Sequence, residues 1–195
     1  MTLRVRPRPR PRSGRTFATA AVSLALLGVL ATAAPSSAAA ADSVADGPAA
    51  GRGVRVSGAA GTTLTQDFGE FAGDAVRIEL DARAAVNGSP TDTRGRFHVV
   101  HRKPDGQLVA DFEGTLGCLV VGGRDAIATG VVTSGTVPRF PDLELIGSKV
   151  AITVQDNGRA DRLGWVWGGF GQPVADCQGT VPFIRTTSGN YAVRG

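Results

Sequence analysis

The 195-residue sequence holds only two histidines and two cysteines, and this shortage limits the chemistry it can carry. A zinc site takes three or four nitrogen or sulfur ligands held close together. The histidines, His98 and His101, are three residues apart, so on a strand they point to opposite faces and share a metal only across a bulge. The sequence also lacks the G-x-S-x-G turn that carries the nucleophilic serine of α/β-hydrolases. We therefore expect no metal and no cofactor, and we assign no catalytic residue.

Helical periodicity is also missing. No stretch of ten residues repeats its apolar side chains with the 3.6-residue period of a helix. Apolar and polar residues alternate instead, most clearly over residues 76–83 and 149–155, and turn sequences such as that of residues 103–106 separate the alternating segments. The pattern predicts one all-β domain over residues 53–195, an antiparallel β-barrel or β-sandwich.

A long apolar run occurs only near the N-terminus. Six arginines crowd the first 16 residues, an apolar run follows, and small residues end it. This order predicts a Sec-type signal peptide over residues 1–40, cleaved after Ala40 or Ala41, and a disordered leader over 41–52. The alternative is an uncleaved anchor, since the run is just long enough to span a bilayer. We expect a secreted, extracellular protein without membrane contact after cleavage.

The predicted signal peptide accounts for the basic character of the chain. It contains six of the 21 basic residues and none of the 17 acidic ones, which leaves 15 against 17 and a net charge of −2. Proteins that bind nucleic acid present a basic surface. We therefore expect no nucleic-acid partner, and an extracellular or cell-surface partner of unknown identity instead.

The two cysteines, Cys118 and Cys177, both follow the predicted cleavage site. Two cysteines in an exported chain most often pair with each other. Two thiols so far apart in sequence are too few for a metal site, and a catalytic thiol would leave the second cysteine without a role. We predict a disulfide. The alternation that runs through Phe112 and Leu116 predicts that Cys118 points inward with them.

Trp165 and Trp167 are two residues apart, so on a strand they share a face. If that face is exposed, the pair forms a platform that stacks on sugar rings. If it is buried, the pair adds aromatic area to the core. Burial is the preferred interpretation, and both remain open at this point.

Residues 156–161 offer oxygen donors around a glycine, at Asp156, Asn157 and Asp161. Such donors can wrap a hard cation such as calcium. The segment lacks the alternating aspartates and the final glutamate of an EF-hand loop. The alternative, which we favour, is a hairpin turn in which Asp161 pairs with Arg159 or Arg162.

Four motifs stand out between residues 75 and 193: Gly95-x-Phe97-x-Val99-x-His101, Phe112-x-Gly114-x-x-x-Cys118-Leu119-x-Val121, Thr129-Gly130-Val131-Val132 and Val154-x-Asp156-x-Gly158-x-x-Asp161-Arg162-x-Gly164-Trp165-x-Trp167. With these motifs, residues 75–193 resemble a group of secreted actinobacterial proteins that often carry the label repetin. It implies a secreted β domain with no assigned activity, so no functional residue is carried over.

Three functional hypotheses follow. The first is a non-catalytic extracellular or envelope-associated binding domain, because no catalytic constellation is apparent. The second is a carbohydrate-binding module that uses Trp165 and Trp167. The third is a hydrolase or lyase in which His98 or His101 works with an acid, Asp111 or Glu113, which share one face of a predicted strand.

Overall fold

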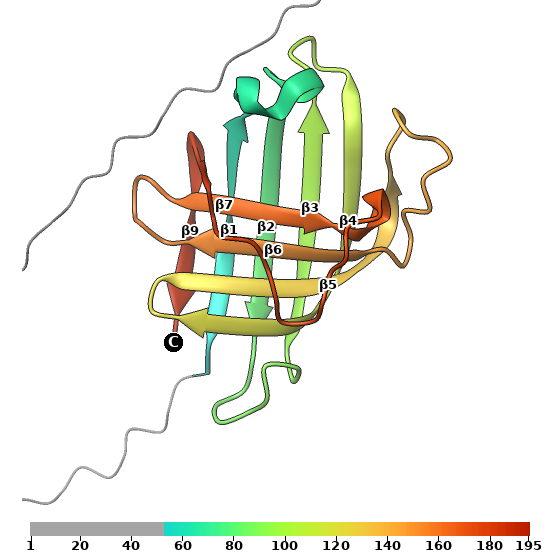
Figure 1. Cartoon of the computed structure of the whole chain (residues 1–195). Coiled ribbons are helices and arrows are strands. Elements are labelled where there is room, and N and C mark those ends of the chain that lie inside the picture. Colours follow the sequence, from blue (N-terminus) through green and yellow to red (C-terminus); the bar gives the residue numbers. More distant parts are fainter. Residues whose placement is uncertain (1–52) are drawn as a thin grey trace, which may run out of the picture. The chain divides into compact units, whose positions relative to one another are not determined.

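The computed structural model describes residues 53–195, which form nine β-strands and two short 3-10 helices (Figure 1). Residues 1–52, with the predicted signal peptide and leader, lie outside the described residues. The elements are β1 (Arg55–Thr63), η1 (Gln66–Phe71), β2 (Ala75–Arg83), β3 (Arg94–Arg102), β4 (Leu108–Gly122), β5 (Asp125–Thr136), β6 (Lys149–Gln155), β7 (Arg162–Trp167), η2 (Gly168–Phe170), β8 (Ile184–Arg185) and β9 (Ser188–Arg194). The all-β prediction is confirmed. No helix within 53–195 is long and apolar enough to cross a membrane.

All nine strands belong to one antiparallel sheet with the order β8-β7-β6-β5-β4-β3-β2-β1-β9. The strands from β1 to β7 follow one another as a meander, and β9 returns to pair with β1. In Figure 1, β5, β6 and β7 pass across β1 to β4 at a steep angle, so the sheet curls over itself into half a barrel. The long strand β4 carries two register shifts, and bulges of this kind bend a strand.

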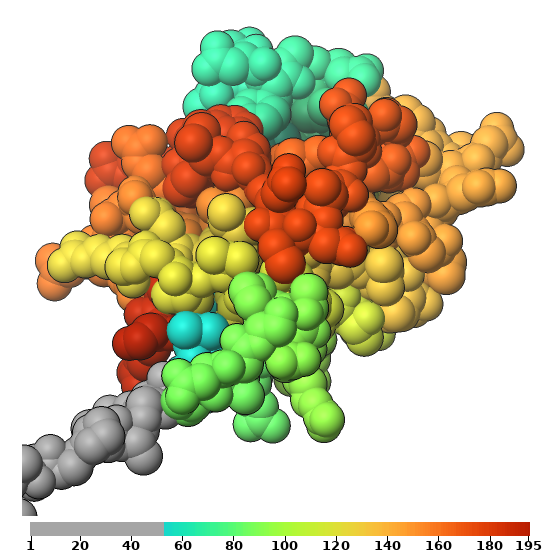
Figure 2. Space-filling model, turned by 60° about the horizontal axis from the view of Figure 1, so that its bottom comes forward, coloured from blue at the N-terminus to red at the C-terminus, as the bar shows by residue number. Residues whose placement is uncertain are grey.

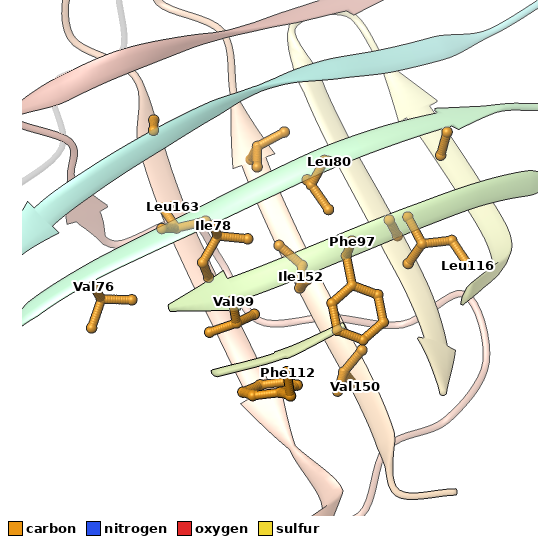
Figure 3. Close-up of a cluster of buried hydrophobic side chains, with 14 of the residues drawn as sticks. Val76, Ile78, Leu80, Phe97, Val99, Phe112, Leu116, Val150, Ile152 and Leu163 are labelled. Atoms are coloured by element: carbon orange, nitrogen blue, oxygen red, sulfur yellow. The ribbon is translucent and has the colours of Figure 1, made fainter. Parts of the chain in front are cut away.

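The hydrophobic core fills the inside of the curl. Figure 3 shows apolar side chains of β2, β3 and β4 opposite those of β6 and β7. The labelled members are Val76, Ile78, Leu80, Phe97, Val99, Phe112, Leu116, Val150, Ile152 and Leu163. In β2 every second residue is buried, as the alternation predicted.

A segment without regular structure, residues 171–183, crosses the outer face of the sheet between η2 and β8; we call it the strap (Figures 1 and 2). Its backbone at Gly179 lies against the side chains of Ile127 and Thr153. The strap explains why Ala151 and Thr153, on the outer face of β6, are 2% and 3% exposed. Both faces of β6 are therefore covered.

The predicted disulfide joins Cys118 to Cys177 in the strap, with a Cα–Cα distance of 5.4 Å. Cys118 is buried, but the expectation that it shares a face with Leu116 is wrong. A bulge between these residues shifts the register at Gly117, so the core takes Leu116 and Leu119 instead. Cys118 pairs across the sheet with Thr129, whose Oγ1 accepts the backbone N–H of Cys177 at 3.0 Å. The disulfide therefore ties the strap to the outer face.

A candidate ligand pocket lined by aromatic side chains

A pocket of about 660 Å³ lies where the two 3-10 helices and the β5–β6 loop meet the ends of β3, β4 and β7; we call it the main pocket. Its volume falls in the range of small-molecule sites. Its lining consists of Leu64, Phe68, Glu70, Phe71, His101, Val109, Ala110, Val137, Phe140, Trp165, Val166, Trp167, Phe170 and Gln172. Apart from the indole N–H groups of the two tryptophans, only three of these side chains are polar or charged, namely Glu70, His101 and Gln172.

Strand β7 places both tryptophans in this pocket. Trp165 pairs with Ile152 and Trp167 with Val150, so both indoles are on the inner face with these core residues. Leu163, earlier on the same face, is fully buried, whereas the tryptophans approach the open end and are half-buried. The shared face predicted from their spacing is confirmed. The pair forms one wall of the pocket. Its half-buried state is intermediate between the two alternatives considered from the sequence, an exposed platform and a fully buried core.

Aromatic rings pack around these indoles. Trp167 stacks on Phe112 at a centroid distance of 4.2 Å and meets Phe170 edge-on at 5.5 Å. Trp165 stacks with Phe68 at 6.2 Å. These rings come from β4, β7 and both 3-10 helices, so the pocket wall is assembled from segments far apart in sequence. Such geometries suit a flat or apolar ligand.

A second, smaller space of about 30 Å³ lies behind the main pocket; we call it the inner cavity. It shares His101, Trp165, Val166 and Trp167 with the main pocket. The remaining lining is apolar and consists of Val76, Ile78, Val99, Phe112, Val150 and Ile152. The inner cavity is large enough for a water-sized group.

His101 lines both spaces and is held by Asp74, its Nε2 lying 2.8 Å from Asp74 Oδ2. The residues are 9% and 4% exposed. Burial lowers the pKa of His101 below its ordinary value of 6.5, the hydrogen bond to Asp74 acts in the opposite direction, and the charge of Arg139 lowers it further. The imidazole is therefore neutral at pH 7. Because a carboxylate only accepts hydrogen bonds, Nε2 carries the proton and Nδ1 keeps a lone pair.

The indole N–H of Trp167 is buried, and no acceptor for it is found in residues 53–195. A buried donor without an acceptor costs about 1–3 kcal/mol. Two other buried atoms share this condition, on Asp125 and Thr153, but neither residue lines the main pocket or the inner cavity. Of these three residues, only Trp167 lines the main pocket or the inner cavity.

An ion pair borders the pocket. Arg139, in the β5–β6 loop, donates to Glu70 Oε2 in η1 at 2.6 Å. The guanidinium lies over the rings of Phe71 and Phe140, at 4.8 and 5.8 Å from their centroids. Cation–π contacts of this kind add to the ion pair. Arg139 therefore joins two loops at the pocket, and its charge is already compensated.

Comparisons with protein-family models, with curated proteins and with solved structures found no match. The pocket is therefore interpreted from its own chemistry: an apolar, aromatic lining with one neutral imidazole and one unpaired indole N–H.

The second histidine lies elsewhere. His98 is on the outer face of β3, so the prediction that the two histidines face opposite sides is confirmed. Its Nε2 lies 2.7 Å from Asp111 Oδ1, and the two side chains are 42% and 39% exposed. Glu113, the other predicted acid, accepts a hydrogen bond from Ser134 Oγ at 2.9 Å. The sheet thus brings His98 to Asp111, but outside both the main pocket and the inner cavity.

The loop of residues 156–161 connects to β9. Asp156 Oδ2 accepts the N–H of Val193 at 3.1 Å. Asp161 Oδ1 accepts the N–H of Asn157 at 2.8 Å, and its Oδ2 accepts that of Tyr191 at 2.6 Å. The carboxylate of Asp161 is therefore bonded to backbone amides and not to a neighbouring arginine.

Metal-binding groups are scarce in the described part of the chain. No group of three or more His, Cys, Asp or Glu side chains in residues 53–195 is placed to hold a metal ion. The calcium prediction for Asp156, Asn157 and Asp161 stays a prediction, because the amide oxygen of Asn157 is also a possible calcium ligand.

Proposed function

We propose that this is a secreted, non-catalytic binding protein whose main pocket takes an apolar small molecule with a ring. The observation that carries the proposal is the concentration of aromatic side chains: both tryptophans of the chain and four of its eight phenylalanines line the pocket. Export is supported by the predicted signal peptide and by the disulfide, a bond typical of oxidising compartments. Membership of the secreted actinobacterial group stays part of this proposal.

The scarcity of polar groups favours an apolar ligand over a sugar. A sugar presents many hydroxyl groups, and each one that is buried without a partner costs free energy. Beyond the indoles, the pocket offers the side chains of Glu70, His101 and Gln172, and Glu70 already accepts from Arg139. The carbohydrate-binding hypothesis for Trp165 and Trp167 is therefore the second candidate, supported by the indole wall alone.

The arrangement of the acids and histidines supports binding rather than hydrolysis. His98 and Asp111 are partly exposed on the outer face and line neither the main pocket nor the inner cavity. His101 has a carboxylate partner inside the pocket, but no serine, threonine or free cysteine lines that pocket to serve as a nucleophile.

Tryptophan fluorescence tests the proposal, because the only two tryptophans both line the pocket. We expect a saturable change in emission on titration with naphthalene and none with cellohexaose or chitohexaose, with calorimetry as a second readout. Phe170→Ala removes part of the wall and should weaken naphthalene binding. Ile146→Ala, an exposed residue outside the pocket, is the control and should leave it unchanged.

Two results would contradict the proposal. A saturable response to an oligosaccharide but not to naphthalene would replace it with the carbohydrate-binding hypothesis. A response to naphthalene that Phe170→Ala and Ile146→Ala alter equally would place the binding outside the main pocket.

A further inference from the structure

We propose that the ligand is a phenol: its ring lies in the main pocket and its hydroxyl group enters the inner cavity between His101 and Trp167. This inference rests on the proposed function and names the chemical class of the ligand. A phenolic hydroxyl donates one hydrogen bond and accepts another. Of the two groups that it would meet, the indole N–H of Trp167 lacks an acceptor, and the Nδ1 of His101 is able to accept.

The first of these groups is His101. Its Nε2–H is used by Asp74, so only Nδ1 can serve a ligand, and Nδ1 is an acceptor in the neutral ring. No hydrogen bond to Nδ1 is found within residues 53–195. Asp74 thus fixes the tautomer of the imidazole. A ligand that reaches His101 therefore has to bring a donor, and an ether or a ketone does not have one.

The second group is Trp167. Its buried Nε1–H lacks an acceptor, so an oxygen atom placed beside it would remove the cost of that unpaired donor. Trp167 and His101 line the same inner cavity, and every other lining residue except Trp165 is aliphatic or a phenylalanine. One atom that both donates and accepts satisfies the two groups together.

The size of the inner cavity limits what can enter. At about 30 Å³ it is far smaller than the main pocket of about 660 Å³, so the ring is assigned to the main pocket and a small polar group to the inner cavity. A carboxylate would bring two oxygens and a charge but no donor for Nδ1. Arg139, which is bonded to the lining residue Glu70, already has its charge compensated by that carboxylate. A single neutral hydroxyl on a ring held in the larger space fits these limits.

Three probes of similar shape separate the contribution of the ring to binding from that of the hydroxyl group: naphthalene, 2-naphthol and 2-methoxynaphthalene. Their dissociation constants are measured by calorimetry on the mature protein at pH 7. We expect 2-naphthol to bind at least tenfold more tightly than naphthalene, about the effect of one well-made hydrogen bond. We expect 2-methoxynaphthalene, which cannot donate and is larger at the oxygen, to bind no more tightly than naphthalene.

Variants test which side chains produce the preference for 2-naphthol over naphthalene. Trp167→Phe keeps an aromatic ring but removes the indole N–H together with part of the fused ring system, so naphthalene binding measured in the same variant accounts for the lost ring area, and the preference for 2-naphthol over naphthalene should still fall. His101→Gln should also reduce it. His98→Ala, on the outer face, is the matched histidine control and should keep the full preference.

Wild-type protein gives a further test in case His101→Gln does not fold. Nitrogen-15 NMR of the two histidines should show the Nε2–H tautomer at His101, and 2-naphthol but not naphthalene should shift its Nδ1 resonance. Equal affinity for naphthalene and 2-naphthol, with no shift at Nδ1, would overturn the inference and leave the proposed function standing. Failure of both probes to bind would overturn both.

Discussion

Tyr191 donates its backbone N–H to Oδ2 of Asp161 at 2.6 Å, and the two residues are 0% and 1% exposed. Tyr191 lies on β9, one end of the sheet order, and Asp161 directly precedes β7, next to the other end. The carboxylate of Asp161 also holds the N–H of Asn157. A side chain thus replaces backbone pairing where the curled sheet meets itself.

Removal of this carboxylate should weaken the contact between β9 and the segment that precedes β7. Asp161→Ala leaves two N–H groups without acceptors, those of Asn157 and Tyr191, and each such group costs about 1–3 kcal/mol. We expect a loss of about 3 kcal/mol in the free energy of unfolding, measured by denaturant titration. Asp156→Ala, at a half-buried residue bonded to Val193, should lose less. Equal losses for the two variants would contradict this role of Asp161.

The fold class could be predicted because burial on one face leaves a period of two in the sequence. Strand β2 follows that pattern over its whole length. The error at Cys118 arose because a bulge at Gly117 adds one residue and reverses the faces that follow. A glycine within a strand is a weak sign of a bulge, and the alternation on either side gives no further sign of it.

The pocket could be predicted only in part. The spacing of Trp165 and Trp167 indicated a shared face, and the structure places them on one. Phe71 and Phe170 come from short 3-10 helices, which leave no periodic pattern. Asp74 was missed as the partner of His101 because 27 residues separate them. The pairing of β2 with β3, which brings Val76 opposite His101, decides that contact.

Two glycines of β4 should respond very differently to the same substitution. A Cβ at Gly114 would lie 2.1 Å from the carbonyl oxygen of Val131 and 2.6 Å from the ring of Phe97. A backbone carbonyl group can move away only if the strand itself shifts, so we expect Gly114→Ala to lower the free energy of unfolding by about 3 kcal/mol or more. A Cβ at Gly117 would meet nothing within 4 Å, so Gly117→Ala should be close to neutral. Thermal unfolding of the pair measures the difference, and comparable melting temperatures would contradict the packing at Gly114.

The disulfide should stabilise the domain through the loop it closes. Cys118 and Cys177 are 59 residues apart, and closure of such a loop is worth about 4 kcal/mol in the chain-entropy model. We expect the Cys118→Ala, Cys177→Ala double variant to lose about that much in denaturant titration. Amide exchange should rise first in the strap, since the bond holds it to the sheet. Uniform exchange across the sheet and the strap would contradict this.

The stability of the domain should depend on His101 in mildly acidic solution. Burial lowers the pKa of His101 in the folded state below 6.5, so the unfolded chain takes up a proton first. The contribution to stability is present above pH 6.5 and is lost as the pH falls through the lowered folded pKa. Asp74 and Arg139 face this ring, and Glu70 compensates Arg139.

Denaturant titrations at about pH 7 and about pH 5.5, above the usual carboxyl range, isolate this effect. Wild type and His98→Ala should both lose stability between the two pH values, and His101→Gln should lose clearly less. Parallel losses in all three proteins would mean that another group is responsible.

The only tyrosine of the chain gives a test of the core that needs no label. Tyr191 is buried and donates its hydroxyl hydrogen to the carbonyl oxygen of Ile78 at 2.8 Å. Burial raises the pKa of Tyr191 above its ordinary value of 10.0. The folded state therefore keeps the neutral phenol, the unfolded chain loses the proton near pH 10, and the stability falls as the pH rises above that value.

On alkaline titration, the phenolate absorbance should stay absent past pH 10 and then rise steeply, together with the loss of the β-sheet circular dichroism signal. In concentrated denaturant the same absorbance should appear near pH 10, because no burial remains. Tyr191→Phe should remove the absorbance change and cost about 1 kcal/mol for the lost hydrogen bond. A gradual rise centred near pH 10 in protein that keeps its circular dichroism would mean that water reaches the phenol, and the packing of the Tyr191 side chain against β2 would then be wrong.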